Sequence, residues 1–185
     1  MYKLPKLIGI CGKKRSGKDI LANYLCNNYS FTNEKISEDL KNIIKILFGF
    51  TDNQLESNEK EDIDKSWGVS PRQTMKFIGT EIMQYKIQEL LPNIKRNFWI
   101  NSFIKKHIEN QTNNIVISDL RFLHEYEALK KYNIYIIRLE RDLENNEDNH
   151  ISETEFLNIP PDVILSNNGT INDLYNKCDI IFNQK

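Results

Sequence analysis

The chain has 185 residues, of which 39% are hydrophobic and 28% are charged, and its formal net charge is -1. This length suits one domain with a core of its own, and the near-zero charge disfavours a nucleic-acid polymer or a membrane as partner, so any anion binding must be local. No apolar run reaches the ~18 residues of a membrane helix, no signal-peptide stretch is present, and three widely spaced cysteines indicate a reducing compartment, so we expect a cytoplasmic protein.

The first expected strand, about Leu7 to Cys11, runs into a glycine-containing loop and then a helix from about Gly17 to Asn28. The loop reads Gly12-x-x-x-x-Gly17-Lys18, and the order strand, loop, helix predicts a phosphate-binding loop (P-loop). Backbone N–H groups of such a loop face the phosphates, its glycines permit the close approach, and the helix adds its positive N-terminal end. Lys18 is then expected to reach the β- and γ-phosphates.

Asp19 stands where such loops usually carry a Ser or Thr that binds Mg²⁺. A carboxylate can also hold Mg²⁺, directly or through water, so we expect Asp19 to be a metal ligand. Lys13, Lys14 and Arg15 add positive charge where the phosphates would lie. A solvated basic face is the alternative for these three residues, and for Lys13 the two interpretations are equally weighted.

An extended piece near residues 35–36 is expected to precede a helix from Glu38 to Phe48. The apolar positions of this helix share one face at helical spacing, namely Leu40, Ile43, Ile44 and Leu47. Lys41 lies off that face; it could reach an acceptor phosphate, but a solvated lysine is the favoured interpretation.

Residues 51–66 are polar and mostly acidic, and we expect an exposed excursion with one short helix. The following helix begins after Ser70 as N-cap, with Pro71 in its first position and Gln73 completing a capping box. Arg72 lies in the first turn, where the helix dipole disfavours a cation. We therefore expect an anionic partner for Arg72, with a surface ion pair as the alternative.

Gly79 lies inside this helix at a cost of about 1 kcal/mol relative to Ala, so we expect it to make room for a ligand or a neighbouring helix. Pro92 ends the helix, and Phe98 opens another that runs to about Glu109. Trp99 in this helix is either a core residue or a stacking surface for a base, and the sequence favours the core.

A short apolar run from Ile115 ends at Asp119. The carboxyl ends of strands line the ligand crevice in doubly wound α/β folds, so we expect Asp119 to act on Mg²⁺ or on the attacking group. Arg121 and Glu125 follow on the turn and the next helix. They could serve the same crevice or form a salt bridge with each other.

Another strand is expected from Ile134 to Leu139, and a polar, Asn-rich segment follows it up to His150. This segment suits a mobile lid that carries Arg138 and Arg141, with His150 as a surface histidine. Residues 152–155 read as a capping box, so that Glu155 has a structural role.

The last strand is expected at Val163 to Leu165, followed by an Asn-Asn-Gly turn and a helix with Thr170 as N-cap. Four short apolar strands separated by helices predict an α/β fold with a parallel sheet and right-handed crossovers. We find no linker that would divide the chain, so a single domain over residues 1–185 is expected.

These residues together resemble the bacteriophage-type deoxynucleoside monophosphate kinases. The resemblance covers residue 7 to the C-terminus and rests on the P-loop with its Asp, on the motifs around Asp119, His150 and Asn168, and above all on the helix from Pro71-Arg72-Gln73 to Gly79-Thr80-Glu81. It implies a P-loop kinase fold with helices on both faces of the sheet, a helical acceptor-binding region at about 37–112 and a lid at about 139–152.

The resemblance implies transfer of the γ-phosphoryl group of ATP to a deoxynucleoside monophosphate, with Mg²⁺ as cofactor, and makes a homodimer plausible. We expect ATP contacts from Gly12, Lys13, Arg15, Ser16, Gly17, Lys18, Asp19, Ile20, Asn168 and Gly169. The residues placed at the acceptor are Lys14, Arg72, Trp99, Asp119, Arg121 and Glu125. Catalytic roles fall to Lys18, Asp119, Arg138 and Arg141, and metal binding to Asp19 and Asp119.

Two other functions stay open. Phosphomevalonate kinase and dephospho-coenzyme A kinase share parts of this plan, but the helix from Pro71 to Glu81 favours a nucleotide acceptor. A regulatory module that binds nucleotide without turnover is the second alternative, and the presence of Lys18, Asp119 and the lid arginines argues against it.

Overall fold

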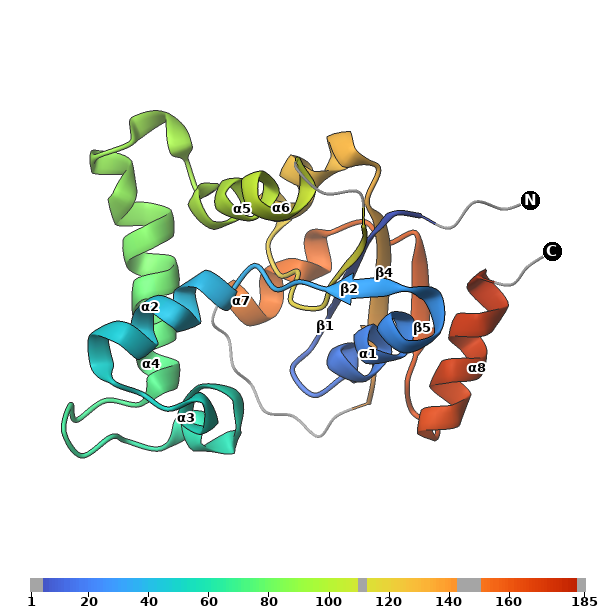
Figure 1. Cartoon of the computed structure of the whole chain (residues 1–185), viewed down its shortest axis with the longest axis horizontal. Helices are drawn as coiled ribbons and strands as arrows, with labels where there is room; N and C mark the ends of the chain where they lie inside the picture. Colours follow the sequence, from blue (N-terminus) through green and yellow to red (C-terminus); the bar gives the residue numbers. More distant parts are fainter. Residues whose placement is uncertain (1–4, 110–112, 143–150, 183–185) are drawn as a thin grey trace. The chain divides into compact units, whose positions relative to one another are not determined.

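The computed structural model describes residues 5–109, 113–142 and 151–182 and forms two compact units (Figure 1). An α/β unit comprises Met1–Lys35 and Ile104–Lys185, and a helical unit comprises Ile36–Phe103. Within the described ranges, no helix is long and apolar enough to cross a lipid bilayer.

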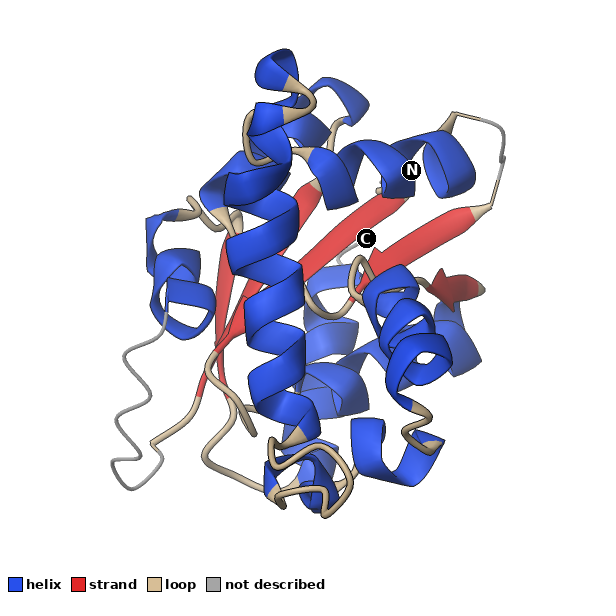
Figure 2. Cartoon of the chain, turned by 90° about the vertical axis from the view of Figure 1, so that its left-hand side faces the viewer, coloured by secondary structure: helices blue, strands red, loops and turns tan. Residues whose placement is uncertain are grey.

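A five-stranded parallel sheet forms the centre of the α/β unit, and its strands are drawn in red in Figure 2. The order of the strands is β2-β3-β1-β4-β5. The strands are β1 (Leu7–Gly12), β2 (Phe31–Asn33), β3 (Asn114–Ile117), β4 (Tyr135–Glu140) and β5 (Val163–Ser166). Because β1 lies between β3 and β4, chain connections leave its neighbourhood in opposite directions. The crevice at such a switch point is the usual ligand site of a parallel sheet.

Four of these strands confirm the positions expected from the sequence, and β2 corrects the fifth. The extended piece was expected near residues 35–36, whereas β2 is formed by Phe31–Asn33 at the edge of the sheet. Only Phe31 of its three residues is buried. A strand this short has no alternation of apolar and polar residues from which it could be recognised.

Helices α1 (Lys18–Tyr29) and α8 (Ile171–Phe182) cover one face of the sheet. Ile8 and Ile10 of β1 point to this face and share a core with apolar residues of both helices, among them Leu21, Leu25, Leu174 and Cys178. The two helices lie side by side (Figure 1). Their contact includes two tyrosines of α1, Tyr24 and Tyr29, whose hydroxyls both donate to Asp179 Oδ1 at 2.7 Å.

Gly9 of β1 points to the opposite face, as the alternation along a strand requires. A Cβ at Gly9 would lie within 2.9 Å of the side chains of Leu120, Ile134 and Ile136, so only glycine fits here. Helices α6 (Leu123–Leu129) and α7 (Ile151–Thr154) and the 3₁₀ turn Glu155–Asn158 belong to this second layer. The expectation of helices on both faces is confirmed.

The capping box expected at residues 152–155 is wrong. Ser152 lies within α7 instead of preceding it, and Glu155 begins the following 3₁₀ turn. Glu155 Oε1 instead accepts a hydrogen bond from the backbone N–H of Leu123 at 3.1 Å, at the start of α6. Glu155 therefore has the structural role that was expected, but for a different helix. His150 and residues 143–150 of the expected lid lie outside the described residues.

The helical unit contains α2 (Glu38–Phe48), α3 (Asp52–Glu56), α4 (Pro71–Lys76) and α5 (Phe98–Phe103). The bounds of α2 are those expected, but its buried face is narrower: Leu40 and Ile44 are buried, while Ile43 and Leu47 are exposed. The expected capping box of α4 is confirmed, because Ser70 Oγ accepts from Gln73 N at 3.2 Å and Gln73 Oε1 accepts from Ser70 N at 2.8 Å.

Helix α4 continues as a π-helical segment, Phe77–Tyr85, and a 3₁₀ turn, Lys86–Glu89, before Pro92. Within that segment, a Cβ at Gly79 would lie 2.5 Å from Leu40 Cδ2, so glycine lets α2 approach closely. The carbonyl of Gly79 accepts a hydrogen bond from Trp99 Nε1 at 2.9 Å. Of the two reasons considered for Gly79, these contacts support the neighbouring helix.

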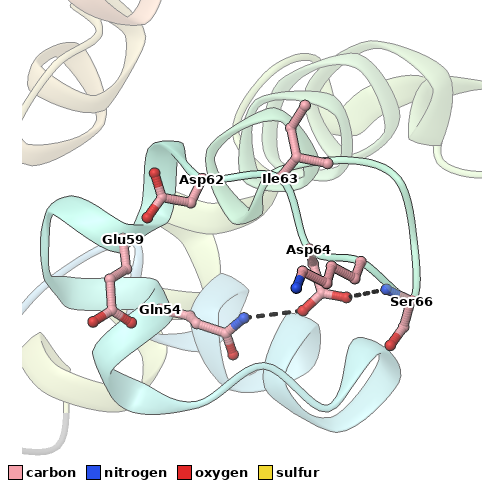
Figure 3. Close-up of a pocket in the computed structure, with 7 residues that line it drawn as sticks. Gln54, Glu59, Asp62, Ile63, Asp64 and Ser66 are labelled. Carbon is pink, nitrogen blue, oxygen red and sulfur yellow. Dashed lines mark hydrogen bonds between the residues drawn. The ribbon is translucent and has the colours of Figure 1, made fainter.

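The acidic segment 51–66 contains the expected short helix, α3, and a polar hollow of ≈ 310 Å³ (Figure 3). Asp64 accepts hydrogen bonds from Gln54 Nε2 at 3.0 Å and from the backbone N–H of Ser66 at 2.9 Å. Glu59 and Asp62 also line the hollow. This negative charge makes the hollow unsuited to a phosphate group.

Candidate active site

The P-loop joins the carboxyl end of β1 to α1, and its two glycines have backbone angles that other residues rarely adopt. Gly12 has φ 149°, and a Cβ there would lie 2.5 Å from the carbonyl oxygen of Leu139. Gly17 has φ 101°, and a Cβ there would lie 2.4 Å from Asn167 Nδ2. The loop conformation therefore requires glycine at both positions.

Lys18 folds back across this loop. Its Nζ donates to the carbonyl oxygens of Gly12 at 2.8 Å and Lys13 at 2.7 Å. Ser16 is fully buried, and Arg15 has the left-handed φ of 65°. The ammonium group of Lys18 is thus held against the loop, where its positive charge would attract the phosphate chain.

Asp19 follows with an exposed carboxylate held by two donors. Its Oδ1 lies 3.0 Å from Lys35 Nζ and accepts a hydrogen bond from Ser118 Oγ at 3.2 Å. Burial alone would raise the pKa of Asp19, but Lys35, Ser118 and nearby Lys18 outweigh it, so this pKa lies below its ordinary value. Asp19 is therefore charged at neutral pH. Neither Lys35 nor Ser118 was singled out from the sequence.

Asp119 lies two residues beyond the end of β3 and is half-buried, directly after Ser118. The hydroxyl of Ser118 bonds to Asp19, so the residue that directly precedes Asp119 is in contact with the other carboxylate proposed from the sequence as a metal ligand. Mg²⁺ prefers oxygen ligands and is often held by one or two carboxylates together with substrate phosphates. The described residues contain no group of three or more His, Cys, Asp or Glu that could hold a metal by itself.

Glu125 is buried at the start of α6, and its Oε2 accepts the backbone N–H groups of Arg121 and Phe122, each at 3.0 Å. These bonds satisfy donors that the helix itself leaves unpaired. Burial raises the pKa of Glu125 to about 8, although the two backbone donors oppose the shift. Glu125 therefore has a structural reason of its own, beside the acceptor contact implied by resemblance.

The two arginines expected in the lid have different surroundings. Arg138 is half-buried in β4, and its Nη2 donates to the carbonyl oxygens of Leu157, at 3.1 Å, and Ile159. These bonds anchor the chain between α7 and β5. Arg141 lies just past the end of β4 and is exposed. Of the two, Arg141 has the exposed side chain.

The turn after β5 contains a residue that sequence reasoning missed. Asn167 is buried, and its Nδ2 donates to the carbonyl oxygen of Ser16 in the P-loop at 2.8 Å. The expected Asn168 is exposed and pairs with Asp142, at 2.6 Å between side chains. Thr170 caps α8 as expected, with its Oγ1 accepting from Asp173 N at 3.2 Å. The Asn-Asn-Gly pattern signalled a turn but not which asparagine supports the P-loop.

The other expected site residues divide between the two units. In the α/β unit, Lys13 is exposed, Lys14 and Arg121 are half-buried, and Ile20 packs against the core beneath α1. In the helical unit, Arg72 is half-buried in the first turn of α4. Trp99 is buried and bonded to Gly79, which supports its interpretation as a core residue. A contact between Trp99 and an acceptor base stays a prediction.

The fold and the P-loop together define the class of the protein, a P-loop kinase. A solved structure of a dephospho-CoA kinase from Campylobacter jejuni matches with a TM-score of 0.53, covering 98% of this chain and 97% of that one at 13% identity. TT1252 from Thermus thermophilus matches with a TM-score of 0.50, covering 98% of both chains at 14% identity. At such identities the likeness shows the fold alone.

Sequence comparison narrows the class. A family model described as deoxynucleotide monophosphate kinase matches residues 46–178. A protein of Acanthamoeba polyphaga mimivirus, provisionally named a deoxynucleotide monophosphate kinase, is 31% identical over 92% of this chain and 93% of its own length. The deoxynucleotide monophosphate kinase of Enterobacteria phage T4 is 22% identical over 93% of this chain and 96% of its own. This chain belongs to the deoxynucleotide monophosphate kinase family, which confirms the resemblance found in its motifs.

Proposed function

We propose that this enzyme transfers the γ-phosphoryl group of ATP to the phosphate of a deoxynucleoside monophosphate, giving the diphosphate and ADP. The observation that supports this most is the P-loop, with Lys18 folded across it, in a chain of the deoxynucleotide monophosphate kinase family. The acceptor already carries an anionic oxygen, so no strong general base is needed. Positioning and neutralisation of charge provide the catalysis.

Each proposed role follows from the chemistry of a side chain. Lys18 exchanges its carbonyl partners for the phosphates of ATP. Arg72 lies in the region about 37–112 that we assign to acceptor binding, and both Arg72 and Arg121 offer the guanidinium fork geometry that suits a phosphate group. Arg141, which is exposed after β4, neutralises charge on the transferring phosphoryl group. Arg138 stabilises the segment from Leu157 to Ile159 through its hydrogen bonds to the backbone. A lid at about 139–152 would exclude water, which otherwise competes as nucleophile.

Asp19 and Asp119 are the residues that fit Mg²⁺, because both supply carboxylate oxygens and Ser118, whose hydroxyl bonds to Asp19, precedes Asp119 in the chain. If bound there, Mg²⁺ would supply positive charge that offsets the negative charge of the phosphates. The carboxylates themselves orient the site, with Asp19 held by Lys35. Action in the cytoplasm, a homodimer, and independence from nucleic-acid polymers and membranes also remain predictions.

A coupled ADP-release assay with ATP and Mg²⁺ tests this proposal. The acceptors are dTMP, dGMP, dCMP, dAMP, their ribose forms, phosphomevalonate and dephospho-coenzyme A. We expect turnover with at least one deoxynucleotide. Turnover only with a non-nucleotide acceptor would overturn the acceptor assignment. ATP binding without any turnover would favour a regulatory module.

Lys18→Ala is the matching variant for this assay. Because the ammonium group stabilises charge on the transferring phosphoryl group, we expect kcat to fall at least about 100-fold. The thermal unfolding temperature should fall by only a few degrees, because one hydrogen bond of Lys18 is exposed and the other is partly buried. Lys131→Ala, at an exposed lysine in the turn after α6, serves as control. Retained turnover in Lys18→Ala would contradict the P-loop assignment.

A further inference from the structure

A basic side chain that belongs to no P-loop motif lies against the carboxylate after Lys18. Lys35 Nζ is 3.0 Å from Asp19 Oδ1. The same oxygen accepts a hydrogen bond from Ser118 Oγ at 3.2 Å. Lys35 follows β2 and Ser118 follows β3, so two neighbouring strands of the sheet each end at a donor to Asp19.

The contact between Lys35 and Asp19 affects the charge of the P-loop. Asp19 stands where a neutral hydroxyl is usual, and it brings a negative charge beside a loop that must receive a polyanion. Like charges at short range repel, and the effect is larger where water is partly excluded. Lys18 also lies nearby, but Lys35 is the cation in direct contact with this charge, since its side chain is only 27% exposed and its Nζ lies 3.0 Å from Asp19 Oδ1.

We propose that Lys35 is a positioning residue of the P-loop, which offsets the negative charge of Asp19 and fixes its carboxylate so that the loop accepts the phosphate chain of ATP. Lys35 acts through Asp19 and is not itself a phosphate ligand. This inference rests on the proposed function, because it concerns the binding of ATP at the same site.

The ion pair can be removed without loss of the fold. Asp19 keeps 68% of its side chain exposed, and ion pairs with an exposed partner add little to stability. Lys35→Met keeps an unbranched apolar stem of similar size and removes the ammonium group with its charge. Asp19→Ser restores the hydroxyl that is usual at this position.

A double-mutant cycle tests the proposal, with ATP binding measured by isothermal titration calorimetry in EDTA, without divalent metal. The proteins are the wild type, Lys35→Met, Asp19→Ser and the double variant. We expect Lys35→Met to weaken ATP binding about tenfold in the wild-type background, from the uncompensated charge of Asp19. In the Asp19→Ser background the same change should weaken binding less than about threefold, because the charge is absent. Lys35→Arg should restore the wild-type affinity.

The control is Lys130→Met, which also removes the cation of an ion pair in the α/β unit. Lys130 Nζ lies 3.4 Å from Glu127 Oε2, and both side chains are exposed. This substitution should leave the affinity for ATP unchanged. Equal losses for Lys35→Met in both backgrounds would overturn the proposal, because Lys35 would then act on the phosphates directly. No loss in either background would overturn it as well. Wild-type protein that binds no ATP, with or without Mg²⁺, would contradict the proposed function together with this inference, whereas an additive cycle in an active enzyme contradicts the inference alone.

Discussion

Arg138 and Arg141 show how far two similar residues can differ in role. Both were expected to act in the lid because both lie near the end of one strand. In the structure, Arg138 is held by the carbonyl oxygens of Leu157 and Ile159, while Arg141 is exposed. Strand alternation explains the difference, because Arg138 lies within β4 and points to one face of the sheet.

Replacing each arginine separates these roles. Arg141→Ala should lower kcat at least about tenfold, because a cation near the transferring group is lost, and should leave stability unchanged. Arg138→Ala should lower the free energy of unfolding by about 1–3 kcal/mol, since two carbonyl groups lose a charged donor. Steady-state kinetics and urea unfolding of both variants measure the two effects. The reverse pattern would show that Arg138 is the catalytic arginine.

Glu125 makes a prediction about pH. Burial raises its pKa to about 8 in the folded protein, against an ordinary value of 4.5, so between these pH values the folded state keeps a proton that the unfolded state releases. The stability from Glu125 is therefore full below pH 4.5 and is lost as pH rises towards 8. Relative to Glu125→Gln, the wild type should lose stability over this range, by at most about 1.4 kcal/mol per pH unit.

Urea unfolding of the wild type and Glu125→Gln between pH 5 and 9 provides the measurement. Glu127→Gln is the control, because Glu127 lies on the same helix with its side chain 54% exposed. If the free energy of unfolding of the wild type, relative to that of Glu125→Gln, stays constant or increases as the pH rises, the raised pKa of Glu125 is contradicted.

At the scale of elements, hydrogen bonds between side chains join α8 to α1 at the edge of an apolar core. Tyr24 and Tyr29 both donate to Asp179 Oδ1, and Tyr24 stacks on Tyr175 with ring centroids 4.0 Å apart. The hydrogen bond to Asp179, followed by burial, raises the pKa of Tyr24 to about 12. Burial, followed by that bond, also raises the pKa of Tyr29.

Asp179→Asn should therefore lower the free energy of unfolding by about 1–2 kcal/mol, because two hydrogen bonds lose their charged acceptor. Both tyrosines have a higher pKa in the folded state than in the unfolded state. In the wild type, their contribution to the free energy of unfolding is therefore full below about pH 10 and is lost as the pH rises further. Tyrosinate absorbance should show two of the eight tyrosines titrating earlier in Asp179→Asn. The control is Glu109→Gln, which affects the exposed bond of Tyr132 to Glu109. An unchanged titration would show that Asp179 does not set these pKa values.

At the scale of the whole molecule, ATP binding and folding stability must be linked. A ligand that binds only the folded state adds about 2.7 kcal/mol at a concentration of 100 Kd. For a chain of this length this corresponds to a rise in Tm of about 5–10 °C. We expect such a rise with ATP and Mg²⁺ in the wild type and none in Gly12→Ala, whose Cβ would lie 2.5 Å from the carbonyl oxygen of Leu139.

Gly49→Ala is the matched control for this thermal-shift experiment. Gly49 has a positive φ of 71° at the end of α2, but no heavy atom lies within 4 Å of its added Cβ. The substitution should therefore lower Tm through backbone strain and still permit the full rise with ATP. If ATP and Mg²⁺ raise the Tm of Gly12→Ala as much as that of the wild type, the P-loop is not where ATP binds.

The P-loop, the helix caps and most of the strands could be predicted from the sequence, because each depends on residues that are close together in the chain. The P-loop needs an apolar strand, two glycines and a helix within residues 7–29, and the caps at Ser70 and Thr170 need residues three positions away. Apolar runs also identified four of the five strands, and with them the parallel sheet. The three-residue β2 carried no such pattern.

Only the tertiary structure decided what surrounds the P-loop. Asn167 bonds to Ser16 across 151 positions and Ser118 to Asp19 across 99, and the order of strands in the sheet brings these residues together. The same holds for Lys35, a lysine among many in the sequence until β2 places it beside Asp19. The sequence determined the chemistry of the loop, because backbone angles and spacing are local properties. The sheet determined its supporting contacts, because these form between segments that are distant in the chain.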